Sequence, residues 1–504
     1  MLFHLKSMDY NCLMDKRQMA QKVFRSDYLK LALILGLAYY IAFIPHRNYP
    51  YIIHIDEWMH LAYSRTMMNA GNLTFTDPFS SGASVPYSPH LEAGFHLFWG
   101  VFQSISGISW MSLFRFFPGI IFMIIILCAY VLGKREGYGW EAAFFTCLIP
   151  TTLGILGPGF LVPVALGLIF ILLALLLVLH VKTFSAYLTL FIFICFLLAT
   201  HAPEAVGIVL ILTPYFLLNI RRNWHETAGM VCSLLLPFFI VFPWITSMLW
   251  PTFLSLFEKQ TLPTYISWPQ VIESYGILPT IICAIGIFFL IQRIEKKGYA
   301  LVFGFAALLI MLMVYMQLHY GVPIMYDRGL MYSMLLISIL AGYGLWTIRN
   351  LDFKNLPILQ RKNQGKMFSF ITHNAGNILA IVLIVITMAV ALPARHHELY
   401  YHMIDFTDYE AFIWINDNID DSYNKAILDP WKATAFSALT GKTVYSRIHS
   451  YPVESDLRAY EFLDNKCTDT TFLKENDITL VYTTGECNNP ALVEVRENIY
   501  LLKK

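Results

Sequence analysis

Long apolar runs separated by short polar segments make up most of the first 393 residues of this chain. A membrane-spanning helix needs about 20 mostly apolar residues, and eleven runs come close to that length. The pattern therefore predicts a polytopic α-helical membrane protein with about 11 transmembrane helices. The predicted spans are 29–45, 112–133, 141–158, 160–180, 184–200, 205–220, 228–249, 276–292, 299–317, 329–348 and 371–393.

A further apolar run at 91–106 is short and contains Glu92 and His96, which indicates a juxtamembrane or re-entrant helix rather than a span. Loops on the cytoplasmic side of a membrane carry an excess of Lys and Arg. With eleven spans and a cytoplasmic N-terminus, Lys134-Arg135 and most of the later basic residues fall inside. A twelfth span at 91–106 would invert every later loop, so eleven spans is the preferred prediction.

This topology divides the chain into three regions. Residues 1–28 form a basic cytoplasmic segment, and 29–393 form the transmembrane domain, whose first outer loop, 46–111, is long. In 394–504, helical and strand-like periodicities alternate, which predicts a small extracytoplasmic α/β domain. Its expected helices are 409–419 and 431–439, and its expected strands are 425–428, 443–446, 478–483 and 492–502.

The cysteines follow the same division. Most lie in apolar runs, where a thiol is normally a small core residue. Cys467 and Cys487 alone share the C-terminal segment, in a compartment that permits disulfides. We expect them either to pair or to be two unrelated free thiols. Because the chain has no C-x-x-C spacing, a structural zinc site is not expected.

Composition supports a membrane location and narrows the choice of partners. The chain is 57% hydrophobic and only 14% charged, and its mean hydropathy is +0.56, whereas a soluble domain is about 25% charged. We therefore expect an integral protein of the cell membrane whose surface contacts the lipid bilayer. The net charge of +1 does not supply the concentrated basic face that nucleic acid requires, so nucleic acid is not an expected partner.

The segment 54–60, directly after the first span, concentrates acids and histidines. Asp56 and Glu57 are neighbours, so they point in different directions and would serve as a general base and as a group that orients the base or holds a cation. The alternative is a solvated acidic loop, but the apolar surroundings favour a catalytic role. His54, Asp56 and His60 are also weak candidates for binding a divalent metal.

Other polar side chains are expected on the same outer face. Asp77, His90 and Glu92 lie later in the first outer loop and would contact a substrate. His201 and Glu204 stand where a span begins. Two interpretations of this pair remain open: a substrate contact, or an acid in the first turn of a helix, where the helix dipole favours it.

Two arginines are candidates for binding a phosphate. Arg328 follows Tyr326-Asp327 at the outer start of the tenth span, and a guanidinium binds phosphate through two hydrogen bonds. Tyr326 and Asp327 would then contact the substrate beside it. The alternative is that Arg328 pairs with Asp327 or extends its charged end to water. Arg115, at the outer start of the second span, has the same two interpretations.

Several motifs occur in a characteristic order within about the first 135 residues. They are Ile55-Asp56-Glu57-Trp58, Gly71-Asn72-Leu73, Asp77-Pro78, Ser88-Pro89-His90-Leu91 and Lys134-Arg135. This order resembles the GT-C superfamily of membrane glycosyltransferases, and most of all its protein O-mannosyltransferase and aminoarabinose-transferase branch. The Pro-Pro-Leu of the mannosyltransferases is Pro89-His90-Leu91 here. The Trp-Trp-Asp-Tyr-Gly signature of oligosaccharyltransferase catalytic subunits is absent.

The resemblance implies transfer of a sugar from a polyprenyl- or dolichyl-phosphate donor to an acceptor hydroxyl at the outer face. The acceptor would be a glycan, a protein or a lipid. Asp56 would deprotonate or orient that hydroxyl, with inversion at the anomeric carbon, and Arg328 would stabilise the leaving phosphate. The sequence assigns no cofactor with certainty, and a divalent metal is the candidate that it leaves open.

Three other classes of protein were weighed against this interpretation. A transporter or lipid flippase would show repeated halves and polar helices near the midplane, whereas the polar groups here collect at one face. An acyltransferase or phosphatase would use His60 or His90 as its base, but no nucleophile site is evident. A non-catalytic membrane scaffold with an outer binding domain has the same expected topology.

Overall fold

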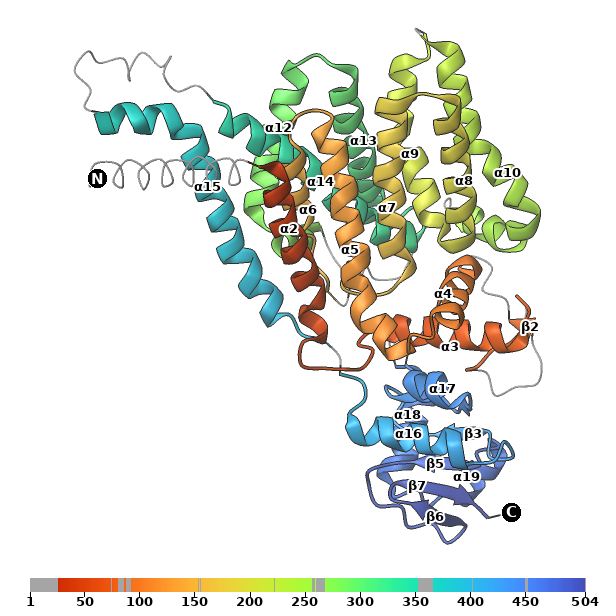
Figure 1. The fold of residues 1–504 in the computed structure, drawn as a ribbon. Coiled ribbons are helices and arrows are strands. Elements are labelled where there is room, and N and C mark those ends of the chain that lie inside the picture. The colour runs from red at the N-terminus through yellow and green to blue at the C-terminus, as the bar shows by residue number, and fades with distance from the viewer. Residues whose placement is uncertain are drawn as a thin grey trace, which may run out of the picture.

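The protein consists of a helical body and a small α/β domain that contains the C-terminus (Figure 1). The structure is a computed structural model that describes residues 26–73, 75–79, 86–87, 92–152, 154, 156–221, 223–255, 259, 268–351, 366–400, 402–448 and 452–503. The predicted cytoplasmic segment 1–28 lies almost entirely outside the described residues.

The helical body is built from long apolar helices. Eight helices in the described residues are long and apolar enough to cross a membrane, and the bent pair α11–α12 would make a ninth. The 17-residue α8 is slightly shorter, so the predicted count of eleven spans is not confirmed. The long helices are α2 (Asp27–Phe43), α5 (Trp110–Lys134), α7 (Pro163–Leu176), α8 (Phe184–Thr200), α9 (Ala202–Asn219), α10 (Trp224–Ser255), α12 (Ile277–Gln292), α13 (Lys296–Met313), α14 (Pro323–Arg349) and α15 (Lys366–His397); α11 (Trp268–Tyr275) is short.

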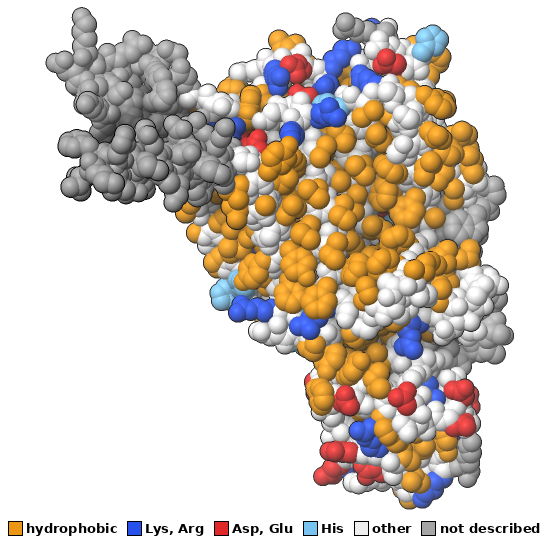
Figure 2. Space-filling view, viewed as in Figure 1, with side chains coloured by type: hydrophobic (Ala, Val, Ile, Leu, Met, Phe, Trp, Pro, Cys, Tyr) orange, Lys and Arg blue, Asp and Glu red, His pale blue; other side chains and the backbone are white. Residues whose placement is uncertain are grey.

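The outer surface of this body is apolar. Figure 2 shows a wide hydrophobic band over the helices, with charged side chains gathered at the two ends. Large apolar side chains on the band are more than half exposed, among them Phe239, Phe288 and Ile381. A soluble protein rarely exposes so large an apolar surface, so this surface faces lipid and the protein is an integral membrane protein.

The segment 141–158, predicted as one membrane-spanning helix, is not a continuous helix in the structure. Helix α6 (Gly139–Thr146) has only eight residues, and the chain then continues without regular structure to α7. This irregular stretch is buried, and its carbonyl groups have partners from distant residues: Arg395 donates to Leu148 O, and Tyr400 donates to Thr151 O. Irregular backbone is tolerated at membrane depth only inside protein, and this stretch meets that condition.

The first outer loop holds the next elements. A short 3₁₀ helix, η1 (Ile44–His46), follows α2 and leads to α3 (Ile55–Ala70). The strands β1 (Phe75–Thr76) and β2 (Pro86–Tyr87) then pair antiparallel, and α4 (Ala93–Ser106) follows. In Figure 1, α3 and α4 lie at the end of the body that faces the C-terminal domain. The 14-residue α4 is not among the candidate spans of the described chain, as predicted for 91–106.

The C-terminal domain has a five-stranded sheet in the order β4-β3-β5-β7-β6. Strand β3 is parallel to β4 and β5, and β7 is antiparallel to β5 and β6. The predicted strand 492–502 is a hairpin that turns at Asn498, and α18 and α19 were not predicted. The elements are α16 (Phe406–Asn418), β3 (Lys425–Ile427), α17 (Ala433–Thr440), β4 (Thr443–Val444), α18 (Glu454–Asp464), α19 (Thr470–Glu475), β5 (Leu480–Tyr482), β6 (Leu492–Arg496) and β7 (Ile499–Leu502).

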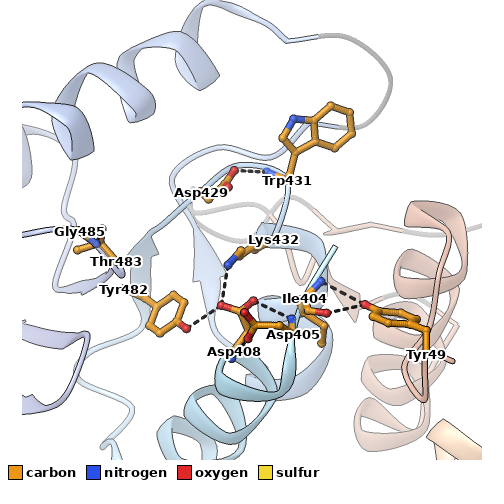
Figure 3. Close-up of polar contacts among 10 residues, drawn as sticks. All are labelled: Tyr49, Ile404, Asp405, Asp408, Asp429, Trp431, Lys432, Tyr482, Thr483 and Gly485. Carbon is orange, nitrogen blue, oxygen red and sulfur yellow. Dashed lines mark hydrogen bonds and ion pairs between the residues drawn. The ribbon is translucent and has the colours of Figure 1, made fainter. Parts of the chain in front are cut away.

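Polar contacts fix this domain internally and against the outer loop (Figure 3). The Asp408 carboxylate accepts hydrogen bonds from Lys432 Nζ at 2.8 Å and from the Tyr482 hydroxyl at 2.7 Å, which ties α16 to β5. The Tyr49 hydroxyl, in the loop before α3, donates to Ile404 O and accepts from Ile404 N. The start of the domain is therefore held beside the start of α3.

A second set of contacts joins α3 itself to the domain. Arg65 donates to the carbonyl oxygens of Ala438 and Leu439 at the end of α17. Arg447 places its guanidinium 4.0 Å from the centre of the Phe79 ring. The helix that carries the acidic motif is thus held between the helical body and the C-terminal domain.

Candidate active site

The acidic motif forms the first turn of α3. His54 is the N-cap: its Nδ1 accepts a hydrogen bond from Asp56 N at 3.1 Å, and its backbone N–H donates to Glu57 Oε2 at 3.2 Å. This reciprocal arrangement satisfies free N–H groups at the helix start. Because His54 Nδ1 is occupied in this way, the weak prediction of His54 as a metal ligand finds no support in the geometry.

Glu57 is fully buried and bonded to the backbone. Its Oε1 accepts from Leu161 N at 2.7 Å, which connects α3 to the turn before α7. Burial raises the pKa of Glu57 to about 8, although backbone N–H groups of Leu161, His54 and Ile53 oppose the shift. Of the two predicted acids, this one is placed to hold the first turn of α3 rather than to contact a substrate.

Asp56 points elsewhere and remains accessible. Its side chain is 21% exposed, and its Oδ2 lies 3.8 Å from His54 Nδ1. Neighbours on a helix are about 100° apart, so the two acids of the motif separate onto different sides of α3, as predicted. Asp56 is therefore the acid of the pair that an external hydroxyl would reach.

A network of titratable side chains lies next to Asp56. His60 Nδ1 is 3.0 Å from His96 Nε2 and 3.9 Å from Glu92 Oε2. The other carboxylate oxygen of Glu92 lies 4.0 Å from His201 Nε2, and His201 Nδ1 contacts Glu204 Oε2. Three segments distant in sequence, in α3, α4 and α9, thus place their polar groups together.

His96 was not predicted as a site residue. A signal was present, because Glu92 and His96 are four residues apart at the start of one short helix and so lie on one face. Glu92 is the N-cap of α4, but its side chain makes no capping bond. Its carboxylate is therefore directed to the histidines.

The charges around this network are mutually coupled. Burial raises the pKa of Glu92; His201 and Arg328 lower it, while Asp56 and Glu204 raise it. These four groups therefore all lie within electrostatic reach of Glu92. Asp56, Glu204 and Arg328, predicted from topology to share one face, thus all act electrostatically on the Glu92 carboxylate.

Two histidines of the network, His60 and His96, have lowered pKa values. Burial lowers the pKa of His60 well below its usual range, with His96, His201 and Arg328 lowering it further. Burial alone lowers the pKa of His96 to about 3. Both imidazoles therefore present unprotonated nitrogens at neutral pH, which is the form that binds a metal.

Glu204 occupies a close contact between α7 and α9. Its side chain is fully buried against Gly167, and its Oε1 has no hydrogen-bond partner among the described residues. Glu204 lies in the first turn of α9, as the helix-dipole interpretation requires. Its contact with His201 also connects it to the network, and the interpretation of the pair as a substrate contact stays a prediction.

Arg328 lies in the second turn of α14 and is half-buried. Its Nε is buried without a hydrogen-bond partner in the described part of the chain. No ion pair between Arg328 and Asp327 occurs among these residues. A guanidinium with an unsatisfied donor beside the network is suited to an anion that the protein itself does not supply.

The remaining predicted residues lie at the edge of the network or elsewhere. Arg115 stacks over Phe43 and Phe116, and Asp77 accepts a hydrogen bond from Phe79 N in a local turn. Tyr326 stacks on Tyr315, with ring centres 4.8 Å apart. Asp327 lies beside the same two rings, and His90 lies outside the described residues.

The two predicted partner cysteines lie together in the C-terminal domain. Cys467 and Cys487 are free, and each thiol is within hydrogen-bonding reach of the other. Asn488 N donates to Lys466 O at 2.8 Å, which holds the two chain segments side by side. The geometry permits a covalent bond but does not require one.

The metal-binding potential of the site rests on His60, Glu92 and His96. One ligand atom of each lies within 4.8 Å of the others. Two nitrogen ligands of a tetrahedral zinc lie about 3.3 Å apart, close to the separation of the two imidazole nitrogens. The donor set fits a zinc-like divalent ion, and it shares only His60 with the predicted set.

The other face of α4 is apolar and exposed. Together with Phe196 of α8, it lines an open cavity of about 480 Å³. Gly94 permits this arrangement, because a Cβ there would come within 2.8 Å of Ala199 O on α8. One short helix thus separates a polar network from an apolar groove. The lining side chains on α4 are Leu97, Phe98, Val101, Phe102 and Ile105.

No protein-family model and no curated protein sequence matches this chain. Three solved structures share its fold. The apo oligosaccharyltransferase of Archaeoglobus fulgidus matches 92% of this chain and 70% of its own, with a TM-score of 0.60 and 11% identity. ArnT from Cupriavidus metallidurans bound to undecaprenyl phosphate matches 94% and 97%, with a TM-score of 0.56 and 13% identity. Arabinofuranosyltransferase AftD from mycobacteria matches 94% and 40%, with a TM-score of 0.57 and 15% identity.

These three neighbours are GT-C glycosyltransferases, and this chain has their fold. Further structures of the Archaeoglobus enzyme contain a dolichol-phosphate with an inhibitory peptide, or zinc with sulfate. At 11–15% identity the likeness establishes the architecture alone.

Proposed function

We propose that this protein, which has the GT-C fold, transfers a sugar from a polyprenyl- or dolichyl-phosphate carrier to an acceptor hydroxyl. The observation that carries the proposal is the polar network that joins α3, α4 and α9 through His60, Glu92 and His201. Asp56, a partly exposed acid, and Arg328, a half-buried arginine with an unsatisfied Nε in the described chain, both act electrostatically on Glu92 and are the kinds of group that such a reaction needs. The acceptor class, whether glycan, protein or lipid, stays open.

Asp56 is the proposed base. It would take or orient the proton of the acceptor hydroxyl as the oxygen attacks the anomeric carbon, inverting that centre as the phosphate leaves. Glu57 acts as a positioning residue through its hydrogen bonds to Leu161 and His54. Because these bonds fix the first turn of α3, they also fix the direction of the Asp56 side chain.

Arg328 is the proposed partner of the phosphate. A phosphodiester leaving group is weakly basic, so it needs positive charge rather than a strong acid. The buried Nε of Arg328 lacks a partner in the described chain, which a phosphate oxygen would supply. His201 and Glu204 would hold the polar wall opposite α3.

The apolar groove on α4 is the proposed seat of the carrier chain. Its exposed residues include Ile105, 82% exposed, and the groove lies on the reverse of the helix that carries Glu92 and His96. The undecaprenyl phosphate in the ArnT structure and the dolichol-phosphate in the Archaeoglobus structure support a carrier of this class.

A divalent metal at His60, Glu92 and His96 is proposed as a cofactor. Such an ion would supply positive charge for a phosphate and polarise its oxygens. The three side chains would bind and orient it, and burial, which lowers the pKa of both imidazoles, favours their neutral, metal-binding form. We expect purified protein to bind about one Zn²⁺ or Mn²⁺ per chain by elemental analysis, and the His60→Ala/His96→Ala variant to bind none. Equal metal content in both would remove the proposal.

The proposed orientation places the N-terminus in the cytoplasm and the site with the C-terminal domain outside the cell membrane. The excess of Lys and Arg in the loops at the other end of the body supports it.

The transfer reaction is tested with full-length protein in detergent and radiolabelled polyprenyl-phosphate sugars. We expect release of labelled sugar to an acceptor or to water, with a loss of about 100-fold or more in Asp56→Asn, because a base contributes about that factor. Arg328→Ala should lose activity by a similar factor, because the negative charge that develops on the leaving phosphate in the transition state would no longer be stabilised.

Matched controls separate these effects from general damage. Asp27→Asn makes the same change on an exposed acid at the start of α2, and Arg458→Ala removes an exposed arginine of α18. Both should keep full activity. Wild-type protein that binds the donor but never cleaves it would favour a non-catalytic scaffold.

A further inference from the structure

A second cavity opens at the end of the helical body farthest from the C-terminal domain. It has a volume of about 480 Å³ and lies where three helix connections meet: the loop before α8, the end of α9 and the start of α13. Figure 2 shows Lys and Arg side chains gathered at this end. The lining residues are Lys182, Tyr215, Asn219, Asn223, Glu295, Lys296 and Lys297.

Two lysines of this cavity lack an anionic partner among the described residues. Lys182 places its Nζ 5.6 Å from the centre of the Tyr215 ring. Lys296 donates to two neutral oxygens, Leu218 O at 3.2 Å and Asn219 Oδ1 at 3.1 Å. Both ammonium groups are therefore held in place without charge neutralisation.

The only acid in the lining is neutralised by an arginine outside it. Glu295 Oε1 lies 2.8 Å from Arg293 Nε. Lys297 interacts with Glu136 at 3.3 Å, behind the cavity wall. The cavity therefore keeps the positive charge of Lys182 and Lys296.

The start of α13 adds to this positive potential. Lys296 and Lys297 are its first two residues, where the helix dipole disfavours a cation. The N-cap Glu295 makes no side-chain capping bond, so N–H groups of the first turn remain available. An anion in the cavity would satisfy the N–H groups and the lysines together.

Exposed apolar side chains stand close in sequence to the lining residues, at the ends of three helices. Leu217 near the end of α9 is 68% exposed, Trp224 at the start of α10 is 61% exposed, and Phe184 at the start of α8 is 82% exposed. Helices α9 and α10 are long and apolar enough to cross a membrane. A ligand here would place its charge against the lysines and its apolar part against these helix ends (the rim).

We propose that this cavity binds the phosphate headgroup of an anionic phospholipid from the leaflet opposite the candidate active site. The ligand is a membrane component rather than free phosphate, because the rim is apolar while the interior is basic. Lys182 and Lys296 would contact the phosphate oxygens, and the acyl chains would lie along α9 and α10. This site is independent of the proposed sugar transfer.

The test is native mass spectrometry of the full-length protein in detergent, titrated with phosphatidylglycerol. A basic residue near a membrane surface changes anionic-lipid affinity by roughly fivefold. We therefore expect Lys182→Gln/Lys296→Gln to bind roughly 25-fold more weakly than wild type. Phosphatidylcholine should bind the wild type far more weakly than phosphatidylglycerol does.

Lys134→Gln is the matched control. Lys134 lies at the same end of the body but over the rings of Tyr28 and Tyr130, outside the cavity. It should keep wild-type affinity, and all variants should show wild-type circular dichroism. If the double variant does not fold, Lys182→Gln alone should lose roughly fivefold.

Three results would overturn the proposal. They are unchanged phosphatidylglycerol affinity in the folded lysine variants, an equal loss in Lys134→Gln, and displacement of the lipid by millimolar inorganic phosphate.

Discussion

The position of Glu204 depends on the absence of a side chain at residue 167. A Cβ at Gly167 would overlap the Cγ and Cδ atoms of Glu204, both in a fully packed contact between α7 and α9. Glu204 in turn contacts His201, whose other nitrogen faces Glu92. A single methyl group at residue 167 would therefore act on the polar network directly, by displacing the Glu204 side chain.

We expect Gly167→Ala to reduce sugar transfer at least tenfold, because a shift of about 1 Å in a site can cost more than that. The protein should still insert and fold. Gly36→Ala is the control, since a Cβ at Gly36 meets nothing within 4 Å. Measured turnover in Gly167→Ala equal to that in Gly36→Ala would show that the position of Glu204 does not matter.

At the residue scale, the sequence predicted the positions that topology alone can place. Asp56, Glu204 and Arg328 were each assigned to one end of a predicted span, and in the structure the charges of all three act on Glu92. Arg115 was assigned by the same rule, but its guanidinium stacks on Phe43. The predicted topology places a residue at one side of the membrane, but it does not say toward which neighbouring helix the side chain points. That direction depends on packing, which a single sequence does not specify.

At the scale of the element, α3 is held at its first turn by one buried acid. Glu57 joins the helix to the turn before α7 through Leu161. The pKa of Glu57 is about 8 in the folded protein, above its ordinary value near 4.5. Between these values the folded protein binds a proton that the unfolded chain releases, so stability falls as pH rises through this window.

We expect thermal stability to fall between pH 7 and pH 8, by at most about 1.4 kcal/mol per pH unit from this group. His60 and His96 oppose the fall near pH 6.5, because their pKa values are lowered and the unfolded chain binds protons there that the folded protein does not; this contribution fades above that pH. The Glu57→Gln variant should be less stable overall, because an amide cannot accept hydrogen bonds from all the N–H groups. Its stability should also change less with pH than that of the wild type. The same slope in both proteins would assign the pH dependence to another group.

Hydropathy predicted the long helices well, but it did not distinguish them from apolar chain that is buried without being helical. The run 141–158 is mostly apolar, yet within it only the residues of α6 are helical among those that the structure describes. An apolar sequence indicates that a segment is buried, but it does not say whether lipid or protein surrounds it. This stretch is buried in protein. In the C-terminal domain the strand pattern of 492–502 was recognised, but the turn at Asn498 was missed because it lacks Gly or Pro.

At the scale of the whole molecule, the oxidation state of the cysteine pair would indicate in which compartment the C-terminal domain lies. Cys467 and Cys487 lie close together in space. A backbone hydrogen bond between their sequence neighbours, from Asn488 N to Lys466 O, holds the two segments side by side. In an oxidising outer compartment the two thiols would lose two protons and two electrons to a protein disulfide and form one bond. In a reducing compartment they would stay free.

We expect this disulfide in protein isolated without reductant. A mass-adding maleimide applied to denatured protein should label wild type and Cys467→Ser/Cys487→Ser to the same extent. After reduction, wild type should gain two labels and the variant none. Two extra labels on wild type before reduction would place the domain in a reducing compartment, against the proposed orientation.

The irregular stretch after α6 has a consequence for how the protein is made. Eight helical residues followed by irregular chain leave peptide groups that hydrocarbon cannot satisfy. Their partners are supplied by Glu57, already synthesised, and by Arg395 and Tyr400, far downstream. Helix α6 also packs against Gly342 of α14, where a Cβ would come within 2.6 Å of Ala142. Because Gly342, Arg395 and Tyr400 are synthesised long after this segment, we expect it to acquire its complete set of contacts only late in synthesis.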